Sequence, residues 1–366
     1  MQDIYFDPSF GNRPQDLVGR ATYLREFEAA LSTRPGNRAR SILILGQRGY
    51  GKTVLLLEMA DIASRNGYIV ASPTVTSKEM PERILEKLHH SSEEFLKKEK
   101  TEITGGSINI LGFGAGIQVQ SKESGTTSFA FRLSELCNKL GEEGHGVMLL
   151  IDEVQANSEE LKQVIIAYQE IVGEGGDIAI VMAGLPGAIS STLNDKVLTF
   201  LNRAKKMNLE PININDVYGY FRNTFKKSKI KISDDDCRAA ALFTAGSPYL
   251  MQLVGHYITI YSDDKGLLTK KYYAAAMEDA KKDFINDIGK ITLHALSEKD
   301  IEFLQAMVMD NDMSSISDVA ERMNVSSAYA QLYKRRLIDS GIIEQPRRGK
   351  VRFAVAYLRD YLMSLG

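Results

Sequence analysis

The chain has 366 residues, of which 44% are hydrophobic and 25% charged, and its formal net charge is −2. This length predicts two or three domains, and the composition is typical of a globular protein with a buried core. The nearly balanced charge excludes a protein that is basic throughout, so contact with nucleic acid requires a local basic patch.

The N-terminal segment, residues 1–16, is expected to be extended because Pro8, Gly11 and Pro14 interrupt regular structure. It lacks the basic start and apolar centre of a signal peptide. No apolar run approaches the roughly 18–20 residues that cross a bilayer. Only two cysteines occur, Cys137 and Cys237, far apart in the sequence, which suits reduced thiols. We therefore expect a cytoplasmic protein with no membrane partner.

The most specific motif follows the apolar run Ile42–Leu45, which predicts a strand. The next residues, GQRGYGKT, fit G-x-x-x-x-G-K-[ST] at every fixed position, and an amphipathic helical pattern comes directly after them. This order predicts a phosphate-binding loop, because glycines let backbone N–H groups surround an anion and the helix start adds positive charge. The residues expected to contact the nucleotide here are Gly46, Gln47, Arg48, Gly49, Tyr50, Gly51, Lys52, Thr53 and Val54. Lys52 would reach the phosphates, and the Thr53 hydroxyl would hold Mg²⁺.

Further strands and helices alternate along the chain, which predicts a parallel sheet flanked by helices. The expected strands are 68–72, 147–152 and 178–183, segment 198–209 leads towards a last strand, and the expected helices are 79–98, 129–140 and 159–172. Residues 101–127 break this pattern, because apolar and polar residues alternate around a glycine-rich centre and predict a β-hairpin insertion. The hairpin could be a packing or oligomer contact or a plain insertion loop. Its GFGAG sequence is not a dinucleotide site, because no helical pattern follows it.

The buried strand 147–152 ends in two carboxylates, Asp152 and Glu153. Downstream of a phosphate-binding loop, this pattern indicates that Asp152 binds Mg²⁺ directly or through water. Glu153 would then orient and activate the attacking water as the catalytic base.

From Ile212 the pattern is helical and predicts a lid. The last 74 or so residues predict three helices, two strands around a basic turn and a final helix, the order of a winged helix-turn-helix. The segment from Gln331 to Arg352 contains seven basic and two acidic residues, so its net charge is positive although that of the whole chain is negative. The candidate DNA-contacting residues are Ser327, Tyr329, Gln331, Lys334, Arg335, Arg347, Arg348 and Lys350. Winged helices also dock proteins or inhibit their own chain, so a protein-contacting role stays open.

Taken together, these segments resemble the AAA ATPase superfamily, and most of all prokaryotic members related to replication-initiator and STAND-type NTPases. The motifs that carry the resemblance are FDPSFGNRPQDLVGR, GQRGYGKT, LLIDEVQ, VMAGLPG, FLNRAKKMNLEPI and GSPYLMQL. The resemblance implies ATP or ADP with Mg²⁺ as ligands. It places Gly19 and Arg20 near the adenine, and Pro248 and Tyr249 in the lid over the nucleotide. It also implies that Arg203 could act catalytically as an arginine finger in a neighbour's site.

The sequence departs from the family pattern in two respects. Met182 and Ala183 stand where many members carry a polar residue that senses the γ-phosphate, and Tyr249 stands where initiator-like members often have arginine. We therefore expect hydrolysis to be slow or to depend on a partner.

The expected fold is an α/β sandwich of the P-loop NTPase type with a parallel sheet. The expected boundaries are 1–16 for the extended segment, 17–210 for the ATPase core, 211–292 for the lid and 293–366 for the winged helix. Two functions follow. The first is an ATPase that couples its nucleotide state to duplex DNA. The alternative is a STAND-like switch or assembly module whose winged helix contacts protein, with a second copy of the chain as one partner.

Overall fold

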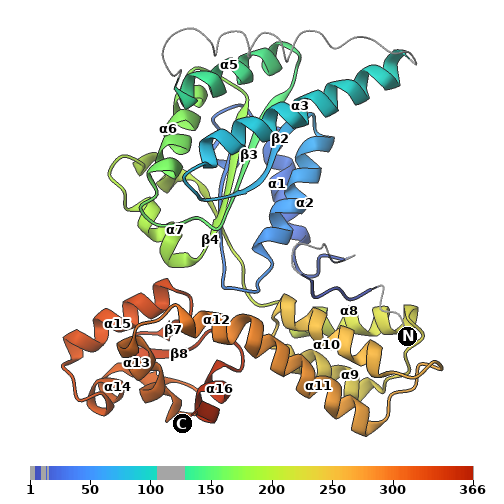
Figure 1. Cartoon of the computed structure of the whole chain (residues 1–366), viewed down its shortest axis with the longest axis vertical. Helices are drawn as coiled ribbons and strands as arrows, with labels where there is room; N and C mark the ends of the chain where they lie inside the picture. The colour runs from blue at the N-terminus through green and yellow to red at the C-terminus, as the bar shows by residue number, and fades with distance from the viewer. Residues whose placement is uncertain (1–4, 10–13, 15, 105–127, 366) are drawn as a thin grey trace.

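The computed structural model describes residues 5–9, 14, 16–104 and 128–365, and it has two lobes (Figure 1). One lobe holds a parallel sheet with helices on both faces, and the other is mainly helical. Among the described residues, no helix is long and apolar enough to cross a membrane. The predicted hairpin lies largely outside the described residues, and residues 101–104 of that insertion belong to the preceding helix.

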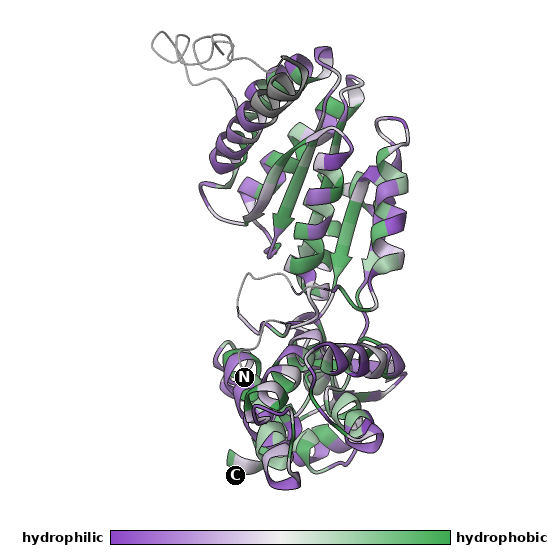
Figure 2. Cartoon of the chain, turned by 90° about the vertical axis from the view of Figure 1, so that its right-hand side faces the viewer, coloured by the Kyte–Doolittle hydropathy of each residue, from purple (hydrophilic) through white to green (hydrophobic). Residues whose placement is uncertain are grey.

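The sheet has five parallel strands in the order β2-β3-β4-β1-β5. Successive side chains of a strand face opposite sides, so Leu43 packs in one core cluster while Ile42 and Ile44 pack in the other. The strands are β1 (Ser41–Leu45), β2 (Tyr68–Val75), β3 (Gly146–Asp152), β4 (Ile178–Gly184) and β5 (Lys205–Asn208). This arrangement confirms the predicted parallel α/β sheet, whose apolar strands are coloured green in Figure 2.

Helices cover both faces of the sheet and complete what we call the sheet domain, from α1 to β5. One face carries α3 (Met80–Thr104), α5 (Phe129–Glu142) and α6 (Glu159–Gly173), and the other carries α1 (Ala21–Leu31) and α2 (Lys52–Arg65). Two 3₁₀ turns, η1 (Arg38–Arg40) and η3 (Thr199–Arg203), precede β1 and β5.

One helix of the sheet domain was not predicted: α7 (Pro186–Leu193) follows β4 directly. In the sequence, the pair Pro186-Gly187 resembles a turn that ends regular structure. However, proline in the first turn of a helix loses no hydrogen bond. The short α7 therefore begins at the proline.

The predicted lid consists of α8 (Ile214–Lys227), α9 (Asp234–Phe243), α10 (Pro248–Tyr261) and α11 (Lys270–Phe284). Three tyrosines of α10 donate hydrogen bonds to aspartates on or just beyond α11: Tyr249 to Asp287, Tyr257 to Asp283 and Tyr261 to Asp279. Beyond α11 the chain forms a π-helix, η4 (Ile285–Lys290), and then α12 (Ile291–His294). Short π-helices are often found at functional sites.

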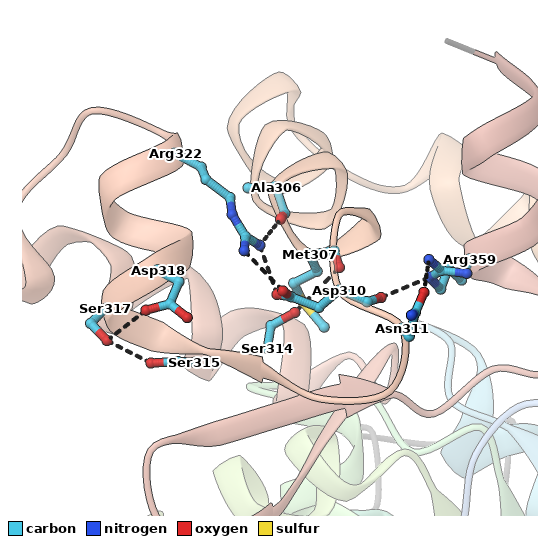
Figure 3. Close-up of polar contacts among 10 residues, drawn as sticks. All are labelled: Ala306, Met307, Asp310, Asn311, Ser314, Ser315, Ser317, Asp318, Arg322 and Arg359. Carbon is cyan, nitrogen blue, oxygen red and sulfur yellow. Dashed lines mark hydrogen bonds and ion pairs between the residues drawn. The ribbon is translucent and has the colours of Figure 1, made fainter.

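The C-terminal region contains the predicted helices and strands in the predicted order: α13 (Glu298–Val308), α14 (Ile316–Arg322), α15 (Ser327–Asp339), β7 (Ile343–Arg347), β8 (Lys350–Phe353) and α16 (Leu358–Leu365). A short strand that was not predicted, β6 (Ser314–Ser315), lies between α13 and α14. The three strands form an antiparallel sheet in the order β6-β8-β7. Polar contacts fix the loop after α13 (Figure 3): Arg322 binds both carboxylate oxygens of Asp310, at 2.7 and 2.9 Å, and Arg359 donates to the Asp310 carbonyl.

The lid and the C-terminal region share one continuous buried cluster. At their boundary the Tyr357 ring packs on Phe243 and its hydroxyl donates to the Phe243 carbonyl, while the Lys281 ammonium lies over the same ring. Phe6 of the N-terminal segment joins this cluster and is 3% exposed.

Candidate nucleotide-binding site

The motif predicted to bind phosphate forms a tight loop between β1 and α2. Gly49 and Gly51 have φ angles of +77° and +79°, a backbone conformation that other residues adopt only with strain. Gly51 is also the N-cap of α2, so the loop leads straight into the positive end of a helix. The sequence folds in this way because Gly49 and Gly51 stand at the two loop positions that need a positive φ angle.

Lys52, the first residue of α2, folds back over this loop. Its Nζ donates to the carbonyls of Gly46 and Gln47, at 2.9 Å each. Burial lowers the pKa of the Lys52 ammonium to about 8, and Asp152 opposes part of that shift. A phosphate beside Nζ would favour the charged form, so the group is suited to bind an anion.

Thr53 and Asp152 meet across the site although 99 positions separate them in the sequence. The Thr53 hydroxyl donates to Asp152 Oδ2 at 2.6 Å, and Asp152 is 5% exposed. A hydroxyl next to a carboxylate suits Mg²⁺, which takes oxygen ligands and completes its shell with phosphate and water. The sequence predicted both as metal ligands, and the structure brings them together.

Glu153 lies at the end of β3 with its side chain exposed and a φ angle of +49°. Its N–H donates to Asp152 Oδ1 at 2.8 Å, which holds this turned backbone in place. Met182 and Ala183, on the neighbouring strand, are fully buried. Glu153 therefore lines a site in which β4 supplies no polar side chain at the two positions, Met182 and Ala183, where a γ-phosphate sensor was expected.

A cavity of about 610 Å³ runs from the phosphate-binding loop to the lid. The predicted residues that line it are Arg20, Arg48, Gly49, Tyr50, Gly51, Lys52, Thr53, Val54, Asp152, Glu153, Pro248 and Tyr249. Burial and the hydrogen bond to Asp287 raise the pKa of the Tyr249 hydroxyl. The volume and the lining suit a nucleotide.

The remaining predicted residues lie beside this cavity or away from it. Gly46 and Gln47 supply the carbonyls that bind Lys52, and Gly19 packs on Ile212. Arg20, which lines the cavity, is also buried and donates to the carbonyls of Tyr50 and Glu210, so it holds the phosphate-binding loop in place. Arg203 is exposed at the end of η3 and is not among the residues that line this cavity.

Sequence reasoning missed the cavity wall made by the N-terminal segment and parts of the lid. Asp7, Pro8 and Ser9 line it, as do Gln252 on α10 and Asp287 on the π-helix. The only sequence signal was the FDPSFGNRP stretch within the family resemblance. The lid residues gave none, because a glutamine or an aspartate on a helix is usually a surface residue.

The predicted DNA-contacting residues lie on one end of α15 and at the β7–β8 turn. Ser327, Tyr329, Gln331 and Arg335 are exposed on α15, and Arg347 and Arg348 are exposed at the turn. Lys334 and Lys350 are half-buried, and the Lys334 ammonium donates to Gln345 on β7.

The opposite end of α15 packs against the sheet domain. A Cβ atom on Gly187 of α7 would lie 2.3 Å from the carbonyl oxygen of Asp339. Gly341, which follows the C-cap of α15 with φ +69°, lies so close to Gln47 that a Cβ there would overlap its side chain. The phosphate-binding loop therefore contacts the C-terminal region directly.

Comparisons with known proteins agree with this geometry. Residues 16–173 match a family described as AAA ATPase domain, and residues 288–362 match a domain of unknown function (DUF8462). No curated protein sequence matches the chain.

Solved structures with the same fold span nearly the whole chain. The Walker-type ATPase PABY2304 of Pyrococcus abyssi has a TM-score of 0.70 and 16% identity, covering 98% of this chain and 100% of its own. The ORC2 protein of Aeropyrum pernix, in ADPNP–ADP complexes, has a TM-score of 0.65 and 14% identity, covering 98% and 95%. Cdc6p from Pyrobaculum aerophilum has a TM-score of 0.51 and 16% identity, covering 98% of this chain and 95% of its own.

Proposed function

Because the chain carries an AAA ATPase domain of the P-loop type, we propose that it binds ATP with Mg²⁺ and hydrolyses it to ADP and phosphate. The observation that carries this proposal is the hydrogen bond between Thr53 and Asp152, in the same cavity as the Lys52 ammonium, on which Asp152 acts electrostatically. One hydroxyl, one carboxylate and one ammonium are thereby gathered where a triphosphate would end.

Each of these groups has a role in the proposed reaction. Lys52 would bind the terminal phosphates, and Thr53 and Asp152 would hold the metal ion, whose charge offsets that of the phosphate oxygens. Glu153 would accept a proton from the attacking water. The apolar end of β4 suggests a slow reaction, and Arg203, exposed outside this cavity, would complete the site of a neighbouring copy.

We further propose that the ATPase acts on duplex DNA through the C-terminal region, interpreted as a winged helix. The start of α15 and the β7–β8 turn are exposed, and the local excess of basic residues lies in the second half of α15 and at the turn. A helix start and a basic turn that face outward together suit a major groove and its flanking phosphates.

Replacing both Arg347 and Arg348 with alanine is expected to weaken DNA binding to a similar degree for unrelated duplexes. Both arginines are exposed at the turn, so they would contact phosphates rather than bases. The slope of log affinity against log salt should fall by roughly 2, since two phosphate contacts are lost. Fluorescence anisotropy with mixed-sequence duplexes, in the apo, ADP and ATP states, measures both quantities.

The matched control replaces Arg65 and Arg222, two exposed arginines on α2 and α8, and should bind DNA as the wild type does. If the wild type shows no salt-dependent binding in any nucleotide state, the DNA proposal is wrong.

A second candidate function is a nucleotide-operated switch that contacts protein. The contact of Gly341 with Gln47 favours it, because a shift of the phosphate-binding loop would press on the C-terminal region. In this proposal the nucleotide state decides whether the C-terminal region stays docked on the sheet domain or is released to a partner.

Replacing Gly187 with alanine is expected to separate the C-terminal region from the sheet domain. The added methyl group would overlap the backbone of Asp339, whereas alanine itself is favourable in a helix. Small-angle X-ray scattering should give a larger radius of gyration than for the wild type. The control is Gly219→Ala on α8, where a Cβ atom meets no atom within 4 Å. Equal radii for the two variants would contradict docking through this contact.

A further inference from the structure

Few positive charges line the nucleotide cavity. Among the described residues, the cations on its wall are Arg20, Arg48 and Lys52. The Arg20 guanidinium is buried and already donates to two backbone carbonyls, so it serves to hold the loop. The lid brings no cation at Tyr249, whose hydroxyl donates to Asp287. Arg48 and Lys52 are therefore the two cations left to meet a terminal phosphate.

Arg48 lies in the phosphate-binding loop close to Lys52. The Lys52 Nζ atom donates to the Gln47 carbonyl at 2.9 Å, and the carbon of that carbonyl is bonded to the backbone nitrogen of Arg48. Burial is the main cause of the lowered pKa of the Lys52 ammonium, and the positive charge of Arg48 lowers it further. Because two like charges repel each other at this range, the pair is suited to an anion that binds both.

The Arg48 side chain is exposed and engaged by no other group. No hydrogen bond or ion pair joins its guanidinium to another residue in the part of the chain that the structure describes. It also lines a smaller cavity of about 330 Å³ between α7 and α15, where Asp339 stands, but the two do not form an ion pair. The guanidinium can therefore turn to a phosphate without breaking a contact, and its planar shape allows two parallel hydrogen bonds to phosphate oxygens.

We propose that Arg48 is a catalytic residue, which supplies within a single chain the positive charge that an arginine finger would bring from a neighbour. This inference rests on the proposed ATP hydrolysis. In the hydrolytic step the water oxygen bonds to the γ-phosphorus, and a water proton passes to Glu153. The bond from the γ-phosphorus to the oxygen shared with the β-phosphate breaks, and that oxygen leaves on ADP with the electron pair. Hydrogen bonds from Arg48 would stabilise the negative charge on these oxygens in the transition state.

The apolar end of β4 makes this charge important. Met182 and Ala183 are buried there and offer nothing polar to the γ-phosphate. Arg48 belongs to the loop itself, so its position depends neither on β4 nor on a second copy of the chain. Arg203 of a neighbouring copy would add to the site only in an assembly, whereas Arg48 would serve it in the single chain.

The experiment compares the wild type with Arg48→Met, which removes the charge and keeps most of the bulk. The variant should bind ADP as the wild type does, while its preference for ATP over ADP falls about tenfold or more, the effect of lost charge-assisted hydrogen bonds. Single-turnover hydrolysis should slow by about 10²–10³-fold. The rate is measured at a dilution at which sizing shows a monomer, so that no neighbouring copy contributes.

Two further variants complete the series. Arg65→Met, at the exposed end of α2, is the matched control and should keep the wild-type rate and preference for ATP. Arg48→Lys keeps the charge and should regain most of the preference for ATP but not the full rate, because an ammonium cannot form two parallel bonds.

The outcomes separate this inference from the proposed function. A wild type that hydrolyses no ATP in any state contradicts the proposed function itself. A wild type that hydrolyses ATP only as an assembly contradicts the role of Arg48, and Arg203 is then the source of the charge. The same role is contradicted if Arg48→Met keeps the rate and preference while its radius of gyration grows, since Arg48 then belongs to the docked interface. If Arg48→Met does not fold, Arg48→Lys decides, because the full rate in that variant contradicts the proposal.

Discussion

Replacing Lys52 with alanine is expected to lower the affinity for ATP by about two orders of magnitude. The ammonium would make charge-assisted hydrogen bonds to the phosphates, and each bond of this kind contributes roughly 1.5–3 kcal/mol. Its present partners are carbonyls of the loop itself, so the exchange for phosphate oxygens requires little movement. Isothermal titration calorimetry with ATP and Mg²⁺ measures the loss.

Lys226→Ala, which removes an exposed lysine from the last turn of α8, is the matched control and should bind ATP as the wild type does. A Lys52→Ala protein that keeps wild-type affinity would remove this loop from the binding site. Because the variant also loses two hydrogen bonds within the loop, its thermal unfolding should be recorded alongside.

Replacing Glu153 with glutamine is expected to leave ATP binding intact and to slow hydrolysis by about 10²–10⁴-fold. Glutamine has the same shape but cannot accept a proton, and general-base catalysis is typically worth that factor. The exposed side chain has room for the change, and the backbone N–H of residue 153 still donates to Asp152. Phosphate release under single-turnover conditions gives the rate, and titration with ATP gives the affinity.

Glu143→Gln, at the exposed end of α5, controls for the loss of one surface carboxylate and should hydrolyse ATP at the wild-type rate. Unchanged turnover in Glu153→Gln would exclude Glu153 as the group that activates water.

The sheet and the phosphate end of the site were predictable from the sequence because their signals are local. A run such as Val147–Ile151 is apolar at every position, which indicates a strand buried on both faces. The spacing of Gly46, Gly51 and Lys52 is fixed by the shape of the loop itself. The approach of Asp152 to Thr53 then follows, because parallel strands end at the same edge of the sheet.

The cavity wall made by the N-terminal segment and the lid was not predictable, since it depends on contacts between distant parts of the chain. Phe6 reaches α8 and α10 across more than 200 positions, and Asp7 meets Gln252 across 245. In their local sequence, Phe6 and Asp7 look like ordinary loop residues and Gln252 looks like an ordinary helix residue. The packing of Gly187 on Asp339 is hidden for the same reason, because a glycine after a proline resembles a turn.

The core that the lid shares with the C-terminal region has a consequence for how the protein unfolds. Residues on both sides of the expected boundary at 292–293 belong to one buried cluster, and Tyr357 fastens its two halves through Phe243. Such a core loses its packing all at once, so the helical lobe should melt as a single cooperative unit, separate from the sheet domain. A fragment cut at that boundary would expose half of the shared core to water and would be prone to aggregate.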